Sequence, residues 1–194
     1  MNILKEIKTT VIVTLILLVV CCGFYPLFVF GAGQLLFPKK ADGSLVLDAD
    51  GKPIASTLLG QTFSADKYFN PRPSAAGQGY DSTSSSGSNL GATSQTLHDN
   101  VKQRVADYRK SNNLSDSALV PADAVTASAS GLDPHISIKN ALLQLPRVAK
   151  ARAMSEDDLK KLVDQYTDGR DLGILGEPGV NIVKLNLALD GKFK

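Results

Sequence analysis

The sequence predicts an α+β protein with one N-terminal transmembrane helix, followed by a single domain in which three or four helices cover a small, mainly antiparallel sheet. Three observations lead to this prediction. An uncharged apolar run occupies residues 9–30, apolar residues recur at helical spacing between residues 94 and 169, and apolar residues alternate with polar ones over residues 181–190. The first pattern suits a membrane, and the other two require a folded domain after it.

The apolar run is long enough to cross a membrane. No Asp, Glu, Lys, Arg or His occurs from Thr9 through Pro38, and twenty helical residues extend about 30 Å, the thickness of the hydrocarbon core. A cleaved signal peptide is the competing interpretation, because Lys5 and Lys8 precede the run. The apolar part of a signal peptide spans only about 7 to 15 residues, so we expect a retained helix, kinked by Pro26.

The predicted span divides the chain into a short head at 1–8, the transmembrane helix at 9–30, a linker at 31–43 and an α+β domain at 44–194. Lys5 and Lys8 before the span nearly balance Lys39 and Lys40 after it, so the positive-inside rule alone does not decide the orientation. Long domains translocate largely regardless of charge, and the short head is the easier piece to retain. We therefore expect a cytoplasmic N-terminus and an extracytoplasmic main domain.

Composition narrows the range of partners. Residues 39–194 carry 19 basic and 18 acidic residues, a net charge of +1, without a basic stripe interleaved with aromatic residues. We therefore expect no nucleic-acid partner. Both cysteines, Cys21 and Cys22, lie in the apolar run, so the domain has neither a disulfide nor a thiolate metal site.

Residues 44–56 predict two short strands around a turn, because Asp50-Gly51 supplies the positive-φ position that a hairpin turn needs. Asp48 and Asp50 also suggest a calcium loop, but the twelve-residue pattern of acidic ligands ending in Glu is absent. Turn chemistry is the better interpretation of these carboxylates.

A long Ser- and Gly-rich segment follows. Thirteen of the eighteen residues at 74–91 are Ser, Gly, Ala or Thr, and a loop of this length is generally either functional or disordered. Prolines on both sides hold the backbone of Arg72 extended, and Tyr68 and Phe69 can attach the start of the loop to the core. These features favour an ordered surface, and the alternative is a solvated linker.

Three helical segments are predicted. The first begins near Ser94 and ends near residue 113, with a single apolar stripe. The second covers residues 138–153 and is interrupted or kinked by Pro146. The third begins after Ser155, an N-cap followed three residues later by a carboxylate, and ends at Gly169. The stripe of the first helix consists of Leu97, Val101, Val105 and Tyr108.

Two further strands complete the predicted domain. Residues 120–131 are β-branched and small, which favours a short strand. Residues 181–190 alternate between apolar and polar side chains, with Ile182 and Ala188 as partial exceptions. This alternation predicts a half-buried strand.

The sequence contains no phosphate loop of the form Gly-x-x-x-x-Gly-Lys-Ser/Thr and no Gly-x-Ser-x-Gly nucleophile motif. His98 and His135 have no partner at the spacing of zinc ligands. The acidic run at 156–158 suits a helix N-terminus better than a catalytic pair. We therefore predict a membrane-anchored interaction module that is not an enzyme and has no metal site.

Five segments closely resemble the C subunit of the Kdp potassium-transporting ATPase of bacteria. They are YFNPRPS at 68–74, SGSNL at 86–90, TASASGLDPHI at 126–136, PRVAKAR at 146–152 and NIVKLNLALD at 181–190. The resemblance covers the whole chain, including the N-terminal span. It departs from the expected family pattern at Ser86, where a second Gly beside Gly87 is expected.

The resemblance implies a single-pass protein of the cell inner (cytoplasmic) membrane, in an ATP-driven, high-affinity potassium uptake pump. Its implied partners are a channel-like potassium-binding subunit, a P-type ATPase subunit, a small single-span subunit and the lipid bilayer. The family role is non-catalytic: stabilisation of the complex, described also as a catalytic chaperone that raises the ATP affinity of the ATPase subunit. ATP is thus expected to bind to the ATPase subunit, and the resemblance leaves direct binding by this chain open. The alternative is a stand-alone membrane-tethered solute- or nucleotide-binding module.

Arg72, Asn70 and Arg147 are the candidate contacts with a partner subunit. Arg72 lies on the Pro-flanked loop, where its backbone is rigid. The alternative for Arg147, which follows Pro146, is a structural side chain that bonds carbonyls at a helix end.

A weaker candidate site is the loop formed by Ser86, Gly87, Ser88 and Asn89. A Ser/Gly loop that leads into a helix can present N–H groups to phosphate, so this loop is a candidate for contact with a nucleotide or a partner. The alternative is that the loop only fills space, because no basic residue is near it in the sequence.

Overall fold

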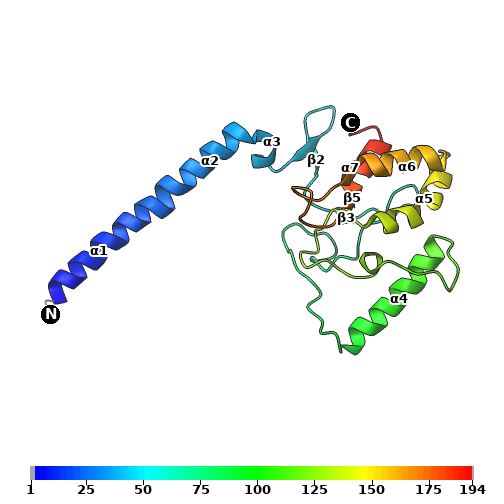
Figure 1. The fold of residues 1–194 in the computed structure, drawn as a ribbon, viewed down its shortest axis with the longest axis horizontal. Coiled ribbons are helices and arrows are strands. Elements are labelled where there is room, and N and C mark those ends of the chain that lie inside the picture. Colours follow the sequence, from blue (N-terminus) through cyan, green and yellow to red (C-terminus); the bar gives the residue numbers. More distant parts are fainter. Residues whose placement is uncertain (1–2, 194) are drawn as a thin grey trace. The chain divides into compact units, whose positions relative to one another are not determined.

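The computed structural model describes residues 3–193 and divides into two compact units, Met1–Leu45 and Val46–Lys194. The described part of the first unit is almost entirely helical, and that of the second combines helices with small sheets (Figure 1). The predicted α+β class, with one N-terminal apolar helix before the domain, is confirmed.

The first unit is built around one long helix. α1 (Ile3–Val19), the π-helical segment η1 (Val20–Phe24) and α2 (Tyr25–Leu36) follow one another without a break. Together they give 34 helical residues that are long and apolar enough to cross a membrane. The helix is longer than predicted at both ends, because it begins within the head at Ile3 and continues into the predicted linker, which also contains α3 (Pro38–Ala41).

Pro26 explains the π-helical segment. It occupies the first turn of α2, directly after η1. Proline has no N–H to donate, and its ring clashes with the carbonyl four residues earlier. A π-helical turn is one of the ways in which a helix absorbs such a local disruption. The helix therefore changes its hydrogen bonding before Pro26 and continues beyond it.

The predicted hairpin is present as β1 (Leu45–Leu47) and β2 (Pro53–Ser56). Gly51 has a φ of +76°. The Asp48 carboxylate accepts hydrogen bonds from the backbone N–H groups of Asp50 and Lys52, at 3.0 and 2.8 Å. This geometry confirms the turn interpretation of Asp48.

The three predicted helices are present. α4 (Gln95–Ser111) begins after Ser94, which caps the Leu97 N–H. α5 (Ile138–Arg152) runs through Pro146 without interruption. α6 (Glu156–Gln165) begins after Ser155, whose hydroxyl accepts a hydrogen bond from the Asp158 N–H at 3.1 Å. The predicted N-cap at Ser155 is therefore confirmed, as is the start of a helix near Ser94.

A three-stranded antiparallel sheet has the order β3-β5-β4. Its strands are β3 (His135–Ile136), β4 (Thr167–Asp168) and β5 (Gly179–Asn181). Thr167 pairs with Val180, and Ile136 pairs with Val180 from the other side. The predicted end of α6 at Gly169 is wrong because β4 begins at Thr167 to pair with β5.

The predicted strand at 181–190 is wrong, because β5 ends at Asn181 and α7 (Ile182–Leu189) follows it. Asn181 is the N-cap, and its side-chain oxygen accepts a hydrogen bond from the Lys184 N–H at 3.1 Å. Five of the eight residues of α7 are buried, and a helix that is apolar on nearly every side shows no single apolar stripe. Alternation therefore did not distinguish strand from helix here.

The predicted strand at 120–131 is also wrong. This segment contains one 3₁₀ turn, η2 (Ala122–Ala124), followed by bends. The Asp123 carboxylate accepts hydrogen bonds at 2.8 Å from the Ser137 N–H, the Ser137 hydroxyl and the Asn140 amide. Side-chain bonds of this kind compete with the backbone ladder of a strand.

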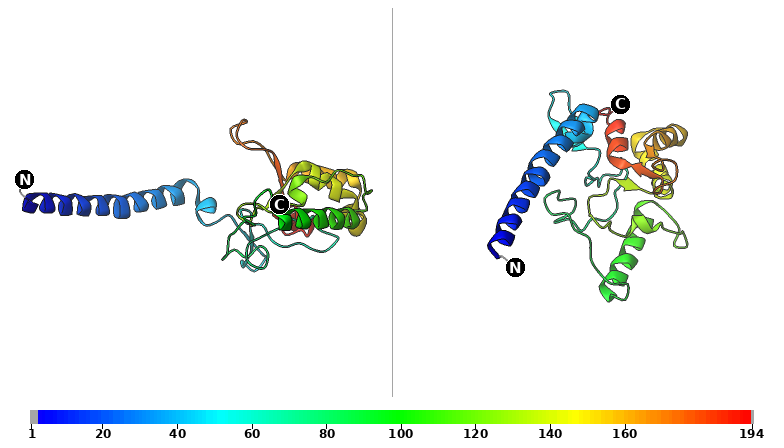
Figure 2. Two further views of the ribbon diagram at one scale, coloured as in Figure 1. Left: turned by 90° about the horizontal axis from the view of Figure 1, so that it is seen from below. Right: turned by 60° about the vertical axis from the view of Figure 1, so that its left-hand side comes forward.

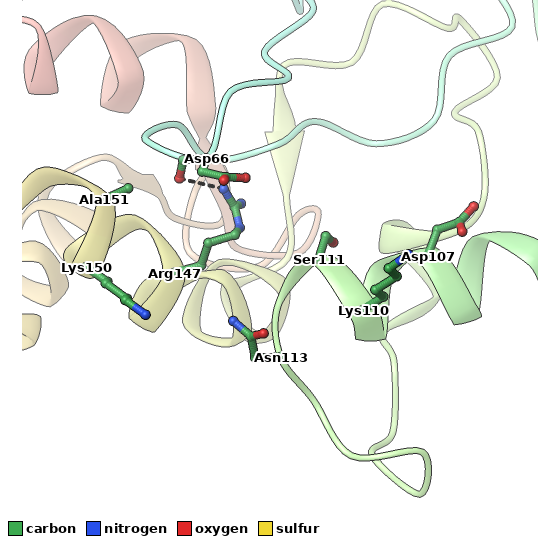
Figure 3. A pocket seen from close by; sticks show the side chains of 8 residues that line it. All are labelled: Asp66, Asp107, Lys110, Ser111, Asn113, Arg147, Lys150 and Ala151. Carbon is green, nitrogen blue, oxygen red and sulfur yellow. Dashed lines mark hydrogen bonds between the residues drawn. The ribbon is translucent and has the colours of Figure 1, made fainter.

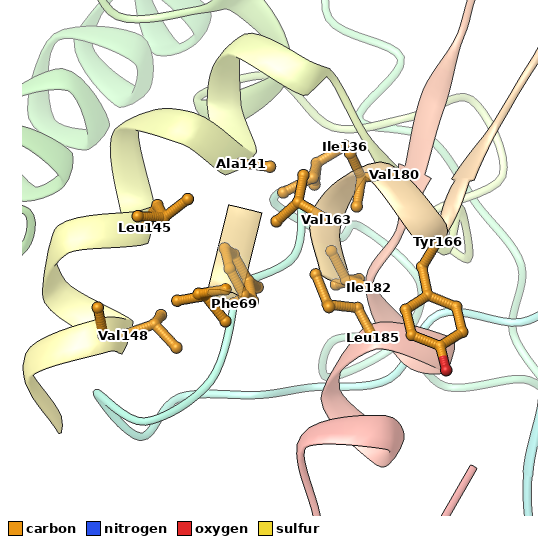
Figure 4. Packing of buried hydrophobic residues seen from close by; sticks show 12 residues of the cluster. Phe69, Ile136, Ala141, Leu145, Val148, Val163, Tyr166, Val180, Ile182 and Leu185 are labelled. Carbon is orange, nitrogen blue, oxygen red and sulfur yellow. The ribbon is translucent and has the colours of Figure 1, made fainter. Parts of the chain in front are cut away.

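The main core lies among α5, α6, α7 and the three-stranded sheet (Figure 4). Phe69 enters this core from an irregular segment and is fully buried. A second cluster joins the hairpin to α7 through contacts of Val46 and Ala55 with Val183 and Leu187. Both cores therefore depend on α7, the element whose type the sequence pattern did not reveal.

Candidate functional site

Residues 68–74 have no regular structure, and buried amide side chains hold the backbone of Phe69 and Asn70. Asn186 on α7 accepts a hydrogen bond from the Phe69 N–H and donates one to the Phe69 carbonyl, both at 2.9 Å. Gln144 on α5 likewise accepts a hydrogen bond from the Asn70 N–H at 2.7 Å and donates one to the Asn70 carbonyl at 3.2 Å. Asn186 and Gln144 therefore supply the hydrogen bonds that a neighbouring strand would give.

Arg147, also on α5, completes this support. Its guanidinium donates to the backbone carbonyls of Asp66 and Tyr68, at 2.6 and 3.1 Å. It also donates to the side-chain oxygens of Asn112 and Gln144, at 3.0 and 2.8 Å. Arg147 is only 8% exposed, and burial lowers the pKa of its guanidinium from the usual value. The geometry favours the structural interpretation of Arg147, although the carbonyls belong to residues 66–68 and not to a helix end.

An open depression of about 650 Å³ lies beside Arg147, whose side chain points toward Asp66 (Figure 3). Basic Lys110 and Lys150 line it together with acidic Asp66 and Asp107. Ser111, Asn113 and Ala151 complete the lining. The mixture of charges leaves the depression without the one-sided potential that attracts a charged ligand strongly.

Arg72 is held between two parts of the domain. Its Nη1 atom donates to Asp133 Oδ2 at 2.9 Å, and 23% of its side chain is exposed. The Tyr80 hydroxyl donates to the Arg72 carbonyl at 2.9 Å, and burial raises the pKa of Tyr80 above its usual range. Within residues 3–193, Arg72 Nε and Asn70 Oδ1 are buried without a hydrogen-bond partner.

Asp133 also belongs to a row of charged groups along the sheet. His135 Nε2 lies 2.9 Å from Asp168 Oδ2, and His135 Nδ1 lies 3.5 Å from Asp133 Oδ1. Lys184 Nζ approaches Asp168 at 3.1 Å. The hydrogen bond with Asp133 raises the pKa of His135, and that with Asp168 raises it further.

The two carboxyl groups in this row shift in the opposite direction. Burial opposes the ionisation of Asp133, but its hydrogen bonds with His135 and the charge of Arg72 outweigh burial and lower its pKa. Asp168 behaves in the same way: its bonds with His135 and Lys184 outweigh burial and lower its pKa. The row is therefore most favourable when the histidine is protonated and both carboxyl groups are ionised.

Residues 86–89 pack against residues 129–130. The Ser86 N–H donates to the Ser130 carbonyl at 3.0 Å, so this N–H group is not free to bind a phosphate. A Cβ on Gly87 would lie 3.0 Å from the Ala129 carbonyl, whereas Ser88 and Asn89 are exposed. These contacts favour the loop-filler alternative over a phosphate cradle.

The first part of the Ser- and Gly-rich segment, residues 74–80, also packs onto the domain. The Ser74 hydroxyl donates to the Gly131 carbonyl at 2.7 Å and accepts from the Ala76 and Tyr80 N–H groups at 3.1 and 2.8 Å. Ala76 is fully buried. These contacts favour the ordered-surface interpretation for residues 74–80.

Sequence reasoning missed the charged row and the buried amides. Asp168 and Lys184 are far from His135 in the sequence, and only the strand pairing brings His135 and Asp168 together. A signal for the amides existed in Asn186, a polar residue inside an apolar run. Across residues 3–193, no group of three or more His, Cys, Asp and Glu residues is arranged to hold a metal ion.

Comparison with known proteins places the chain in a family. The model of the family described as "KdpC: K+-transporting ATPase, c chain" matches residues 7–191. The potassium-transporting ATPase KdpC subunit of Mycobacterium tuberculosis (strain ATCC 25618 / H37Rv) is 52% identical over 186 residues, covering 96% of this chain and 98% of the relative. Those of Rhodopseudomonas palustris (strain BisB5) and Geobacter sulfurreducens are 50% and 47% identical, covering 96% of this chain and 97% and 98% of the relatives. The chain belongs to the KdpC family of potassium-transporting ATPase subunits.

Proposed function

We propose that this chain is a non-catalytic accessory subunit that stabilises a bacterial potassium uptake ATPase. Its partners in this proposal are the channel-like, P-type ATPase and small single-span subunits. The full-length family match supports the proposal. The apolar helix Ile3–Leu36 is the membrane anchor, with the N-terminus in the cytoplasm and the Val46–Lys194 unit outside it.

The rigid support of residues 68–74 is the observation that carries the proposal. Asn186 and Gln144 hold two successive peptide groups from two different helices, and Arg147 holds the carbonyls just before them. A surface that is already ordered loses little conformational entropy when it binds. Arg72 and Asn70 are our candidate contacts with the channel-like subunit, and Arg147 supports the segment from beneath.

In this proposal the subunit raises the ATP affinity of the ATPase subunit indirectly. ATP is cytoplasmic, so a domain outside the membrane does not touch it. A subunit that binds one conformation of the pump more tightly shifts the population toward that conformation, and such coupling acts on affinity at a distant site. Omission of this chain is expected to raise the KM of the remaining complex for ATP.

The test is assembly. The full chain is co-expressed with the other subunits, and the complex is recovered through a tag on the ATPase subunit. Arg72→Glu is expected to lower the recovered complex about tenfold, a change typical of a contact worth about 1.4 kcal/mol. The control is Lys102→Glu on the exposed side of α4, which is expected to leave recovery unchanged.

Arg72→Glu also places two negative charges together, because Asp133 lies opposite. Arg72→Gln is therefore made in parallel, and the circular dichroism of each purified chain reports whether it is folded. Wild-type recovery of the complex from both folded Arg72 variants would contradict the proposed contact.

The alternative function is a stand-alone solute- or nucleotide-binding module, and the depression beside Arg147 is the observation that favours it. Its 650 Å³ is large enough for a small ligand, and Lys110 and Lys150 would contact an anionic one, although Asp66 and Asp107 oppose it. Calorimetric titration of the purified full chain with ATP is expected to show no saturable binding. Saturable binding that Lys110→Ala and Lys150→Ala abolish would favour the alternative.

A further inference from the structure

The connection between β4 and β5, residues 169–178, forms an arm that projects from the domain (Figure 2, orange loop in the left view). Three large aliphatic side chains lie within four residues near its tip. Leu172, Ile174 and Leu175 are 89%, 74% and 56% exposed. Single exposed aliphatic residues are ordinary, but a cluster of this kind marks an interaction surface.

The arm has a defined shape. Asp171 and Leu175 exchange backbone hydrogen bonds, each of 2.9 Å, and Arg170 pairs with Glu177 at 2.8 Å across the arm. At its base, β4 and β5 are paired within the three-stranded sheet. The apolar tip is therefore presented on a preformed hairpin, which lowers the entropy lost on binding.

Leu172 is unfavourable at its position in the free domain for two reasons. Its side chain is almost fully exposed, and its φ of +52° lies in the left-handed region, which disfavours residues that have a side chain. The next residue, Gly173, has a φ of +78°, which glycine adopts without strain because it has no side chain. A leucine at Leu172 therefore contributes nothing to the fold that a smaller residue would not.

The composition of the arm distinguishes between a protein and a lipid surface. Residues 169–178 contain no aromatic residue, one basic residue and two acidic residues. Segments that bind membrane surfaces use Trp and Phe, which enter the lipid boundary, and several Lys or Arg, which anionic lipids attract. An arm of net negative charge with an aliphatic tip instead suits an apolar pocket of a protein that is flanked by basic side chains.

We propose that this arm docks into an apolar, basic-rimmed pocket on the extracytoplasmic surface of another subunit of the potassium-transporting ATPase. The proposal rests on the proposed function, and it names a contact separate from Arg72. Leu172 and Ile174 enter the pocket, while Asp171 faces its basic rim and Glu177 stays paired with Arg170. Buried aliphatic side chains at the centre of an interface and charges at its edge form the usual arrangement of a specific contact.

The test uses the full chain co-expressed with the other subunits. The double variant Leu172→Ser, Ile174→Ser is expected to lower recovery of the complex by about tenfold or more. Leu119→Ser removes another leucine that is 77% exposed and lies outside the arm, and it is expected to leave recovery unchanged. Both variants are expected to unfold at the wild-type temperature, because neither change removes a buried side chain. A photo-crosslinking residue at position 172 is expected to join this chain to another subunit.

Wild-type recovery of the folded double variant would overturn the inference. Crosslinks from position 172 only to lipid, or only to a second copy of this chain, would also overturn it. The two proposals are distinguishable. If the wild-type chain does not assemble with the other subunits, the proposed function fails and the docking inference fails with it. If the wild type assembles and the double variant assembles equally well, only the docking inference fails.

Discussion

Helix α5 and the three-stranded sheet both hold residues 66–74, but they do so with different chemistry. The α5 side uses buried groups, with Gln144 and Arg147 bonded to backbone atoms. The sheet side uses partly exposed ion pairs, in which Asp133 links Arg72 to His135. A buried polar atom that loses its partner is costly, at about 1 to 3 kcal/mol, whereas an exposed ion pair contributes about 0 to 1 kcal/mol.

The difference assigns a separate role to each side. Neutral amides and an arginine do not titrate in the physiological range, so the α5 side fixes the backbone at any ordinary pH. Histidine titrates near neutrality, so the strength of the sheet side depends on pH. The backbone of residues 66–70 is therefore held at any ordinary pH, whereas the contacts of His135 with Asp133 and Asp168 weaken as the pH rises.

Removal of Arg147 is expected to have the largest effect. Arg147→Met leaves two backbone carbonyls and the Asn112 side-chain oxygen without their donor and removes one of the two donors to Gln144, and we expect a loss of about 3 kcal/mol or more in the free energy of unfolding. Urea unfolding of the full chain measures it. Lys150→Met, one turn later and exposed, is the control, and a loss below about 1 kcal/mol for Arg147→Met would contradict the role given to it.

Replacement of Asn186 is expected to cause the second-largest loss of stability. Asn186→Leu keeps the size of the side chain but leaves the N–H and carbonyl of Phe69 unpaired in the core. The expected loss is about 2 to 3 kcal/mol in the same urea experiment. Asn100→Leu on the exposed face of α4 is the matched control. Equal stability of the two variants would show that Asn186 does not hold the 68–74 segment.

The smallest effect is the pH dependence of the sheet side. The pKa of His135 is raised above 6.5 in the folded chain, so its contribution is present below that pH and is lost as the pH rises through the folded pKa. The pKa values of Asp133 and Asp168 are lowered, so their contributions are lost only when the pH falls through these lowered values.

From about pH 6 to about pH 8, the wild type is therefore expected to lose stability relative to His135→Asn. Thermal unfolding at a series of pH values measures this difference, and His98→Asn, on exposed α4, is the control. An identical pH dependence for the wild type and His135→Asn would show that His135 does not stabilise the fold through its ion pairs. Because 37% of the His135 side chain is exposed, solvent screening keeps the expected difference small.

Local signals predicted much of the fold correctly. α4 begins near Ser94 and Ser155 caps α6, both as expected, because the start of a helix depends on residues within one turn. Asp50-Gly51 predicted the hairpin for the same reason, and the apolar run predicted the long first helix from its length. The candidate contacts Arg72 and Asn70 do lie together on one supported segment.

The features that were missed depend on contacts between distant residues. Asn181 caps α7 only because β5 ends there, after pairing with β3 and β4. Asp123 replaces the expected strand at 120–131 by bonding Ser137 and Asn140. Neither the buried amides nor the charged row leaves a periodic pattern in the sequence, so alternation and spacing could not reveal them.

If the Val46–Lys194 unit binds its partners outside the cytoplasm, its side of the membrane can be measured in intact cells. Ser84 and Ser115 are exposed, and each is replaced by Cys in turn in a chain whose Cys21 and Cys22 are changed to Ser. A membrane-impermeant thiol reagent is then applied to intact cells. We expect both positions to be labelled in intact cells. Labelling only after lysis would place the unit in the cytoplasm and would contradict an extracytoplasmic partner-binding domain.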